Sequence, residues 1–248
     1  MNYKAVGQLI KSAKSVFVIA GWGLSAPSGI PSLQFNKELW EQDPSAVLST
    51  VMFQMRPKKV WEFVSKYKRL IAGAKINKAH IALHDLHLKL QSQHKSFHVV
   101  THTIDGLLSR YWKNKNLIEM YGNINYMRCS KGCSHKLCDV SNDLNEIPLC
   151  SNCKNYMRPH VLLRDERKVE DFFDMEELIG KGLECDCMLI IGSQLKNFLL
   201  QELVNDHLMA KKLTININKE NDGEWIKKNV VSIREVCEIS LPQILDTF

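Results

Sequence analysis

Apolar runs alternate with helical patterns along most of this chain. Mostly apolar runs predict buried strands at residues 16–20, 97–101, 117–122 and 187–192, and the segment 213–218 is a further predicted strand. Apolar residues at intervals of three and four predict helices at residues 3–14, 37–75, 77–90, 169–183 and 198–210. Strands without polar alternation are typical of a parallel sheet covered on both faces. The pattern therefore predicts an α/β fold with helices on both sides of a parallel sheet.

Glycine turns follow three of the predicted strands. Gly21, Gly106 and Gly192 all come at or just beyond the carboxyl end of a strand, where ligands bind in open parallel sheets. Glycine lets backbone N–H groups approach a phosphate, and a helix that starts beyond the turn adds partial positive charge. The turn at Gly21 therefore indicates a phosphate site. Small-residue turns after strands are also common, so this turn alone equally fits a purely structural role.

The cysteines suggest a metal site. Cys129-x3-Cys133 is followed, after sixteen residues, by Cys150-x2-Cys153. Two such pairs supply the four thiolates of a tetrahedral structural zinc site, which leaves no open position for catalysis. His135 and Cys138 are alternative ligands. The remaining cysteines, which we interpret as buried apolar thiols, are Cys185, Cys187 and Cys237.

Composition and charge narrow the possible partners. Apolar residues make up 45% of the chain and the formal net charge is +6, which helps to recruit an acidic ligand such as a dinucleotide. The basic stretch at residues 56–69 is interpreted as a solvated helix face, so we expect no nucleic-acid partner. His80, His84 and His87 share a helix face, where packing or solvation is favoured over a metal site.

The chain shows no export or membrane signal. No apolar run approaches the ~20 residues of a membrane span, and the run at residues 16–20 is too short for a secretory leader. We therefore expect an intracellular protein, cytoplasmic or nuclear and not secreted. Reduced cysteines in such a compartment favour metal binding over disulfides.

The first glycine turn also carries a family resemblance. Residues 21–31 read G-W-G-L-S-A-P-S-G-I-P and resemble the sirtuin cofactor loop, G-A-G-I-S-A-x-S-G-I-P-D-F-R. Further segments resemble sirtuin motifs in the family's order: V-W-E-F at 60–63, N-x-A-H-x-A-L at 77–83, T-H-T-I-D-G-L-L at 101–108, E-M-Y-G at 119–122, M-R-P-H-V at 157–161, the segment 186–195 and I-N-x-E at 217–220. The resemblance covers nearly the whole chain.

The resemblance implies a Rossmann-like NAD-binding domain with a small zinc-ribbon and helical module. Residues 1–35, 76–125 and 159–248 would form the large domain, 36–75 the helical part of the module and 126–158 the zinc ribbon. The implied activity is NAD-dependent deacylation of protein lysines, with NAD and zinc as cofactors. The implied NAD contacts are Gly21, Trp22, Gly23, Ser25, Ile30, Pro31, Gln34, His102, Thr103, Asp105, Gly192, Ser193, Gln194, Asn218, Glu220 and Cys237. The implied catalytic residues are Tyr121, Asp105 and His102.

Tyr121 is the main departure from the family, which has a histidine base at this position. A free phenol has a pKa near ~10, so about one molecule in a thousand is ionised at neutral pH. Either Arg110 or Arg164 is a candidate for lowering that value, and His102 is a candidate replacement base.

Other substitutions lie in the part of the site where, by the resemblance, the reacting ribose and the peptide would bind. Trp22 replaces alanine and could fill the ribose pocket. Other family residues are replaced by Leu33, Gln34, His102, Thr103 and, at a glycine of the peptide-binding segment, Asp165.

Two classes of function therefore remain open. The first is an NAD-consuming enzyme with weakened chemistry, acting as a deacylase, an ADP-ribosyl transferase or an NAD hydrolase on a protein or acyl-lysine peptide. The second is a catalytically silent module that binds NAD or ADP-ribose or docks a protein.

Overall fold

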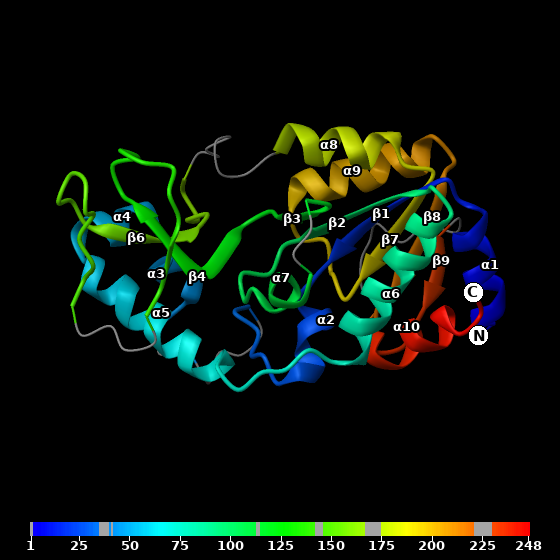
Figure 1. The fold of residues 1–248 in the computed structure, drawn as a ribbon, viewed down its shortest axis with the longest axis horizontal. Helices are drawn as coiled ribbons and strands as arrows, with labels where there is room; N and C mark the ends of the chain where they lie inside the picture. Colours follow the sequence, from blue (N-terminus) through cyan, green and yellow to red (C-terminus); the bar gives the residue numbers. More distant parts are fainter. Residues whose placement is uncertain are drawn as a thin grey trace.

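The predicted buried strands form one parallel sheet of six strands, in the order β3-β2-β1-β7-β8-β9 (Figure 1). A computed structural model describes residues 2–34, 40, 42–112, 115–141, 146–166, 175–220 and 230–248. The strands are β1 (Ser15–Ala20), β2 (Ser96–Thr101), β3 (Leu117–Glu119), β7 (Cys187–Ile191), β8 (Leu213–Ile217) and β9 (Val230–Ile233). The strand order reverses between β1 and β7, so the ligand crevice is expected beyond their carboxyl ends.

Helices cover both faces of this sheet (Figure 1). In β1, Val16 and Val18 face one core with α1 (Tyr3–Ser12), α6 (Lys78–Ser92) and α10 (Cys237–Leu245). Phe17 and Ile19 face the other core, with α8 (Met175–Glu184) and α9 (Phe198–Met209). Burial on both faces explains why the strand is apolar throughout. In the described part of the chain, no helix is both long and apolar enough to traverse a membrane.

A smaller module lies beyond one end of the sheet (Figure 1). Its antiparallel sheet has the order β5-β4-β6. The elements are α3 (Pro44–Val47), α4 (Thr50–Met55), α5 (Pro57–Ile71), β4 (Gly122–Cys129), β5 (Cys138–Asp139) and β6 (Met157–Val161). Val60 and Val64 of α5 are buried in one cluster with Ile124 and Val161. The fold class is thus confirmed, while the proposed domain boundaries stay a prediction.

Several predicted elements differ in extent. The helical pattern at 37–75 contains three separate helices, because Pro44 and Pro57 each begin a new one; residues 37–39 and 41 lie outside the described residues. The strand at 117–122 stops at Glu119, and Tyr121 lies in a turn before β4. The helix at 169–183 is described only from Met175 onward. β9 and α10 were not predicted.

The histidine face of α6 is used for packing. His80 and His87 are buried, and the His87 ring lies 4.9 Å from that of Trp112. His84 contacts the Tyr111 ring at 4.9 Å. Among the described residues, these histidines form no group of three metal-ligating side chains. Packing is therefore the role that the structure supports.

Buried histidines predict a loss of stability in mild acid. Burial lowers the pKa of His80, His160 and His207 to about 4 each. On acidification, the histidines of the unfolded chain are therefore protonated at a higher pH than those of the folded protein. The contribution of the buried histidines to the free energy of unfolding is full above ~pH 6.5 and falls toward pH 4. By urea denaturation, we expect the free energy of unfolding at pH 5 to be lower than at pH 7.5 by about 2 kcal/mol for each histidine.

A variant isolates one of these contributions. His207→Gln should reduce the slope of unfolding free energy against pH by about 1.2 kcal/mol per pH unit between pH 5 and 6. His94→Gln, at an exposed position, is the matched control. Burial raises the pKa of Glu119 to about 7. Glu119 therefore makes the free energy of unfolding rise as the pH falls, which is opposite to the effect of the histidines. An unchanged slope in His207→Gln would contradict the prediction.

Candidate functional site

One large cleft, of about 1720 Å³, lies at the carboxyl ends of β1, β2, β7 and β8. This volume exceeds the ~300–1,000 Å³ typical of small-ligand sites. The predicted site residues that line it are Trp22, Gly23, Pro31, Gln34, His102, Thr103, Asp105, Tyr121, Gly192, Gln194, Asn218, Glu220 and Cys237. The others, which are absent from the lining, are Gly21, Ser25, Ile30 and Ser193. The fold therefore gathers most of the predicted set around one space.

Glycines allow two loops of the cleft to touch through their backbones. The Gly21 N–H donates to Ile191 O and the Gly23 N–H donates to Gly192 O, each at 2.9 Å. A Cβ at Gly23 would lie 2.6 Å from the Gly192 Cα, and Gly192 has a φ of +58°. Side chains at these positions would force apart the turn that begins α2 (Trp22–Ser25) and the turn after β7.

Trp22 is accommodated at the edge of the cleft. Its indole N–H donates to Ile30 O at 2.8 Å, and its ring packs against the buried cluster of the small module. Gln34 is exposed nearby, and its backbone N–H donates to Ser32 Oγ at 3.1 Å. The indole lines the cleft without closing it.

Asp105 supplies a buried carboxylate. It follows β2 and is 1% exposed, and its Oδ1 accepts from the Leu107 N–H at 2.7 Å. Oδ2 is buried and makes no hydrogen bond of good geometry. Burial raises the Asp105 pKa, while the Leu107 N–H and the nearby side chains of Ser25 and Thr103 lower it as hydrogen-bonding groups. A buried carboxylate oxygen without a well-formed hydrogen bond is costly, so a ligand donor at this position would be favoured.

His102 connects the ends of β2 and β7. Its Nε2 lies 2.8 Å from Ser193 Oγ, which also accepts from the Leu195 N–H at 3.1 Å. Burial lowers the His102 pKa to about 4, so the ring is neutral at pH 7. An imidazole with so low a pKa is a weak base. The role of His102 as a replacement base stays a prediction.

The far end of the cleft is formed beyond β7 and β8. Asn218 Nδ2 donates to Ser193 O at 3.0 Å, and Gln194 Nε2 donates to Glu220 Oε2 at 3.4 Å. Cys237 is 2% exposed, and burial raises its thiol pKa to about 12. This thiol is therefore neutral, and the prediction that Cys237 is buried is confirmed.

Tyr121 is hydrogen-bonded to Asn197 and not to an arginine. The Asn197 Nδ2 donates to the Tyr121 hydroxyl at 2.6 Å, and burial raises the phenol pKa despite this bond. Arg164 instead donates to Ser45 Oγ at 3.4 Å, and Arg110 lines a separate cavity of about 420 Å³. The suggestion that either arginine lowers the Tyr121 pKa is therefore wrong.

Asn197 was missed by sequence reasoning. It is the N-cap of α9, and an asparagine directly before a predicted helix was the available signal. That signal predicts a cap but gives no indication of a contact with Tyr121, because the two residues are 76 positions apart.

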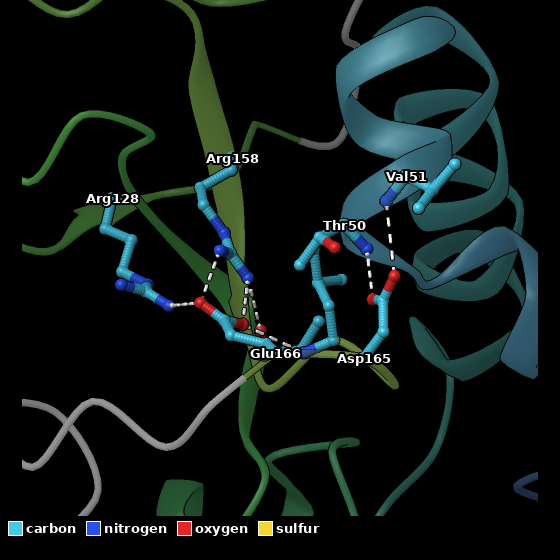
Figure 2. Close-up of polar contacts among 8 residues, drawn as sticks. Thr50, Val51, Arg128, Arg158, Asp165 and Glu166 are labelled. Atoms are coloured by element: carbon cyan, nitrogen blue, oxygen red, sulfur yellow. Dashed lines mark hydrogen bonds and ion pairs between the residues drawn. The ribbon is translucent and has the colours of Figure 1, made fainter.

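One wall of the cleft is formed by residues 162–164. The Glu166 carboxylate connects this wall to the small sheet (Figure 2). Arg158 donates to its two carboxylate oxygens at 2.6 and 2.7 Å, and Arg128 donates at 3.0 Å. The Leu163 N–H donates to the same carboxylate at 3.1 Å. Burial opposes ionisation of Glu166, but Arg158, Leu163 and Arg128 outweigh it and lower its pKa.

Asp165 makes a second attachment of this wall (Figure 2). Its carboxylate accepts from the backbone N–H groups of Thr50 at 2.6 Å and Val51 at 3.4 Å, at the start of α4. The Arg164 N–H donates to Leu48 O at 2.9 Å. The aspartate, which stands where the resembling sirtuin segment has glycine, therefore ties this wall to α4, and the Arg164 backbone ties it to the end of α3.

The four predicted cysteines come together in the small module. Sγ–Sγ distances are 3.4 Å for Cys129–Cys133, 3.5 Å for Cys129–Cys153 and 3.5 Å for Cys133–Cys150. All four sulfurs lie within 4.8 Å of one another. A tetrahedral zinc with ~2.3 Å bonds requires sulfurs ~3.8 Å apart, so the cluster fits this ion. Neither of the alternative ligands belongs to it.

Known proteins of one family resemble this chain in both sequence and fold. The profile of the Sir2 family matches residues 21–198. The chain is 28% identical over 202 residues to NAD-dependent protein deacylase 1 of Caldanaerobacter subterraneus, covering 79% of this chain and 78% of the relative. It is 31% identical over 185 residues to an NAD-dependent protein deacylase of Thermus thermophilus, covering 74% and 71%. A solved Sir2 enzyme structure superposes with a TM-score of 0.79 at 27% identity, covering 99% of this chain and 96% of that one.

Proposed function

Because the chain belongs to the Sir2 family, we propose that its cleft binds NAD and that the protein is an NAD-dependent protein deacylase with weakened chemistry. The observation that carries the proposal is Asp105, whose buried Oδ2 makes no well-formed hydrogen bond, in a cleft at the point where the strand order reverses. When bound, NAD would supply a ribose carbon made reactive by nicotinamide as a leaving group. The protein or acyl-lysine peptide is its proposed second substrate.

The residues present fit such a ligand. The turn at Gly23, which lines the cleft, would lie beside the phosphates, and Asn218 and Glu220 would contact the adenosine end. Asp105 would receive a donor from the nicotinamide end, where a hydrogen-bond partner for its Oδ2 is most favourable.

Four thiolates fill the coordination of zinc, so the metal would stabilise the small module and take no part in the reaction. We propose an intracellular location, because a four-thiolate metal site needs cysteines that stay reduced.

Tyr121 supports the expectation of weakened chemistry. Because burial raises its pKa, the phenol is protonated at neutral pH and is a poor base. Loss of general-base assistance commonly costs about 10²–10⁴ in rate. The same observation favours a second candidate function, a module that binds NAD or ADP-ribose without turning NAD over.

Calorimetric titration tests the nucleotide site. We expect the wild-type protein to bind both NAD and ADP-ribose, and Asp105→Asn to weaken NAD binding about tenfold or more with a smaller effect on ADP-ribose, which lacks nicotinamide. Asp206→Asn, an exposed position in α9, is the matched control. Failure of the wild-type protein to bind either nucleotide would contradict the proposal.

Release of nicotinamide then separates the two candidates. Release that requires an acetyl-lysine peptide supports a deacylase, and release without peptide supports hydrolysis or transfer of ADP-ribose. Intact nucleotide binding with no release under either condition supports the silent module.

A further inference from the structure

Tyr121 is held in place through both its backbone and its side chain. It lies in the turn between β3 and β4, and its carbonyl accepts from the Leu162 N–H at 2.9 Å. Gly122 follows with a φ of +76°, a conformation that fixes the direction of the turn. The side chain is half-buried and lines the cleft. The phenol therefore has a defined position at the cleft wall.

The orientation of the Asn197 amide follows from its role as N-cap of α9. Its Oδ1 accepts from the Leu200 N–H at 3.0 Å, so the group 2.6 Å from the Tyr121 hydroxyl must be the NH₂. An amide NH₂ only donates, so the phenol oxygen is the acceptor in this bond. The phenolic hydrogen must therefore point in another direction, and no residue in the described part of the chain accepts it.

We propose that Tyr121 donates a hydrogen bond to an oxygen of the nucleotide bound in the cleft, and that Asn197 is the positioning residue that directs this donor. The proposal rests on the proposed function, since it takes an ADP-ribose-type ligand with hydroxyl and phosphate oxygens as the acceptor. It gives Tyr121 the opposite role to that of a proton-abstracting base at the same position. The raised phenol pKa is consistent with this role, because the hydrogen is retained at neutral pH.

Two variants test the donor. Tyr121→Phe keeps the ring and removes the hydroxyl, and we expect ADP-ribose affinity, measured by calorimetry, to fall about five- to tenfold. Asn197→Asp keeps the cap of α9, because aspartate also accepts from the Leu200 N–H. Its second carboxylate oxygen would accept the phenolic hydrogen and withdraw it from the ligand. We therefore expect Asn197→Asp to lose affinity to a similar extent.

A purely structural link between the two residues predicts a different result. Asn197→Asp would preserve that link with its donor reversed, and ADP-ribose affinity would stay at the wild-type level. Tyr156→Phe, exposed in the small module, is the matched control and should bind normally. An ultraviolet titration measures the ionisation of Tyr121 when the curve of the matching protein with Tyr121→Phe is subtracted. In the wild-type background we expect Tyr121 to ionise above pH ~10. In the Asn197→Asp background we expect it to ionise at a still higher pH.

The outcomes separate this inference from the proposed function. Wild-type binding with no loss in Tyr121→Phe or Asn197→Asp overturns the donor role and leaves the nucleotide site intact. Absence of ADP-ribose binding by the wild-type protein overturns both. Loss in Tyr121→Phe alone shows a contact with the ligand but overturns the positioning role of Asn197.

Discussion

Cys150→Ser is expected to release the metal from the four-cysteine cluster and to destabilise the small module. The purified wild-type protein should carry about one zinc per chain, and the variant close to none. Structural zinc sites contribute ~10–16 kcal/mol of binding free energy in isolated zinc-binding peptides, so its loss removes a large share of the module's stability. We expect the thermal midpoint to fall by about 10 °C or more.

Cys138→Ser is the matched control for this prediction. Cys138 lies in β5, in the same small sheet, but outside the cluster. Metal analysis by mass spectrometry and thermal unfolding should find the Cys138→Ser protein like the wild type. A wild-type protein that contains no zinc, and that is as stable as Cys150→Ser, would show that the cysteine cluster does not bind this metal.

Glu166→Ala is expected to lower the free energy of unfolding by about 3–5 kcal/mol. The side chains of Arg128 and Arg158 are only 5% and 9% exposed, so removing Glu166 takes away the carboxylate that these two buried cations share. The Leu163 N–H also loses its acceptor, in the wall that lines the cleft. Urea denaturation measures this effect directly.

Asp165→Asn provides the comparison for Glu166→Ala. Asp165 is exposed, and an asparagine oxygen still accepts from the Thr50 N–H at the start of α4, so we expect only a small change in stability. Equal stability of Glu166→Ala and the wild type would mean that the buried ion pairs contribute no net stabilisation. The Glu166→Gln variant, which keeps the shape and removes the charge, should give an intermediate loss.

Local sequence patterns were sufficient to predict most of the main sheet. The strands at Val16–Ala20 and at 187–191 are apolar on every position because helices cover both faces, and that condition is visible in the sequence. The cysteine spacing likewise identified its cluster, because both pairs are close in sequence and each needs only a short turn. β9 escaped detection because it is short and partly exposed.

Element boundaries were less well predicted where two elements meet. Apart from Glu119, the run at 117–122 is largely apolar, and it crosses a point where the chain leaves one sheet and enters another. Apolarity reports burial and not chain direction, so the turn that contains Tyr121 was not apparent.

The sequence by itself determined the fold class, the family and the metal-ligating cysteines, because each depends on the spacing of residues near one another along the chain. Only the tertiary structure determined which side chains in the cleft contact one another and which of them are ionised. Tyr121 meets Asn197 across 76 positions, His102 meets Ser193 across 91, and Asp165 meets Thr50 across 115. These contacts depend on strand order and on how the loops at the strand ends converge. Burial there sets the ionisation of each side chain, and burial is a property of the assembled fold.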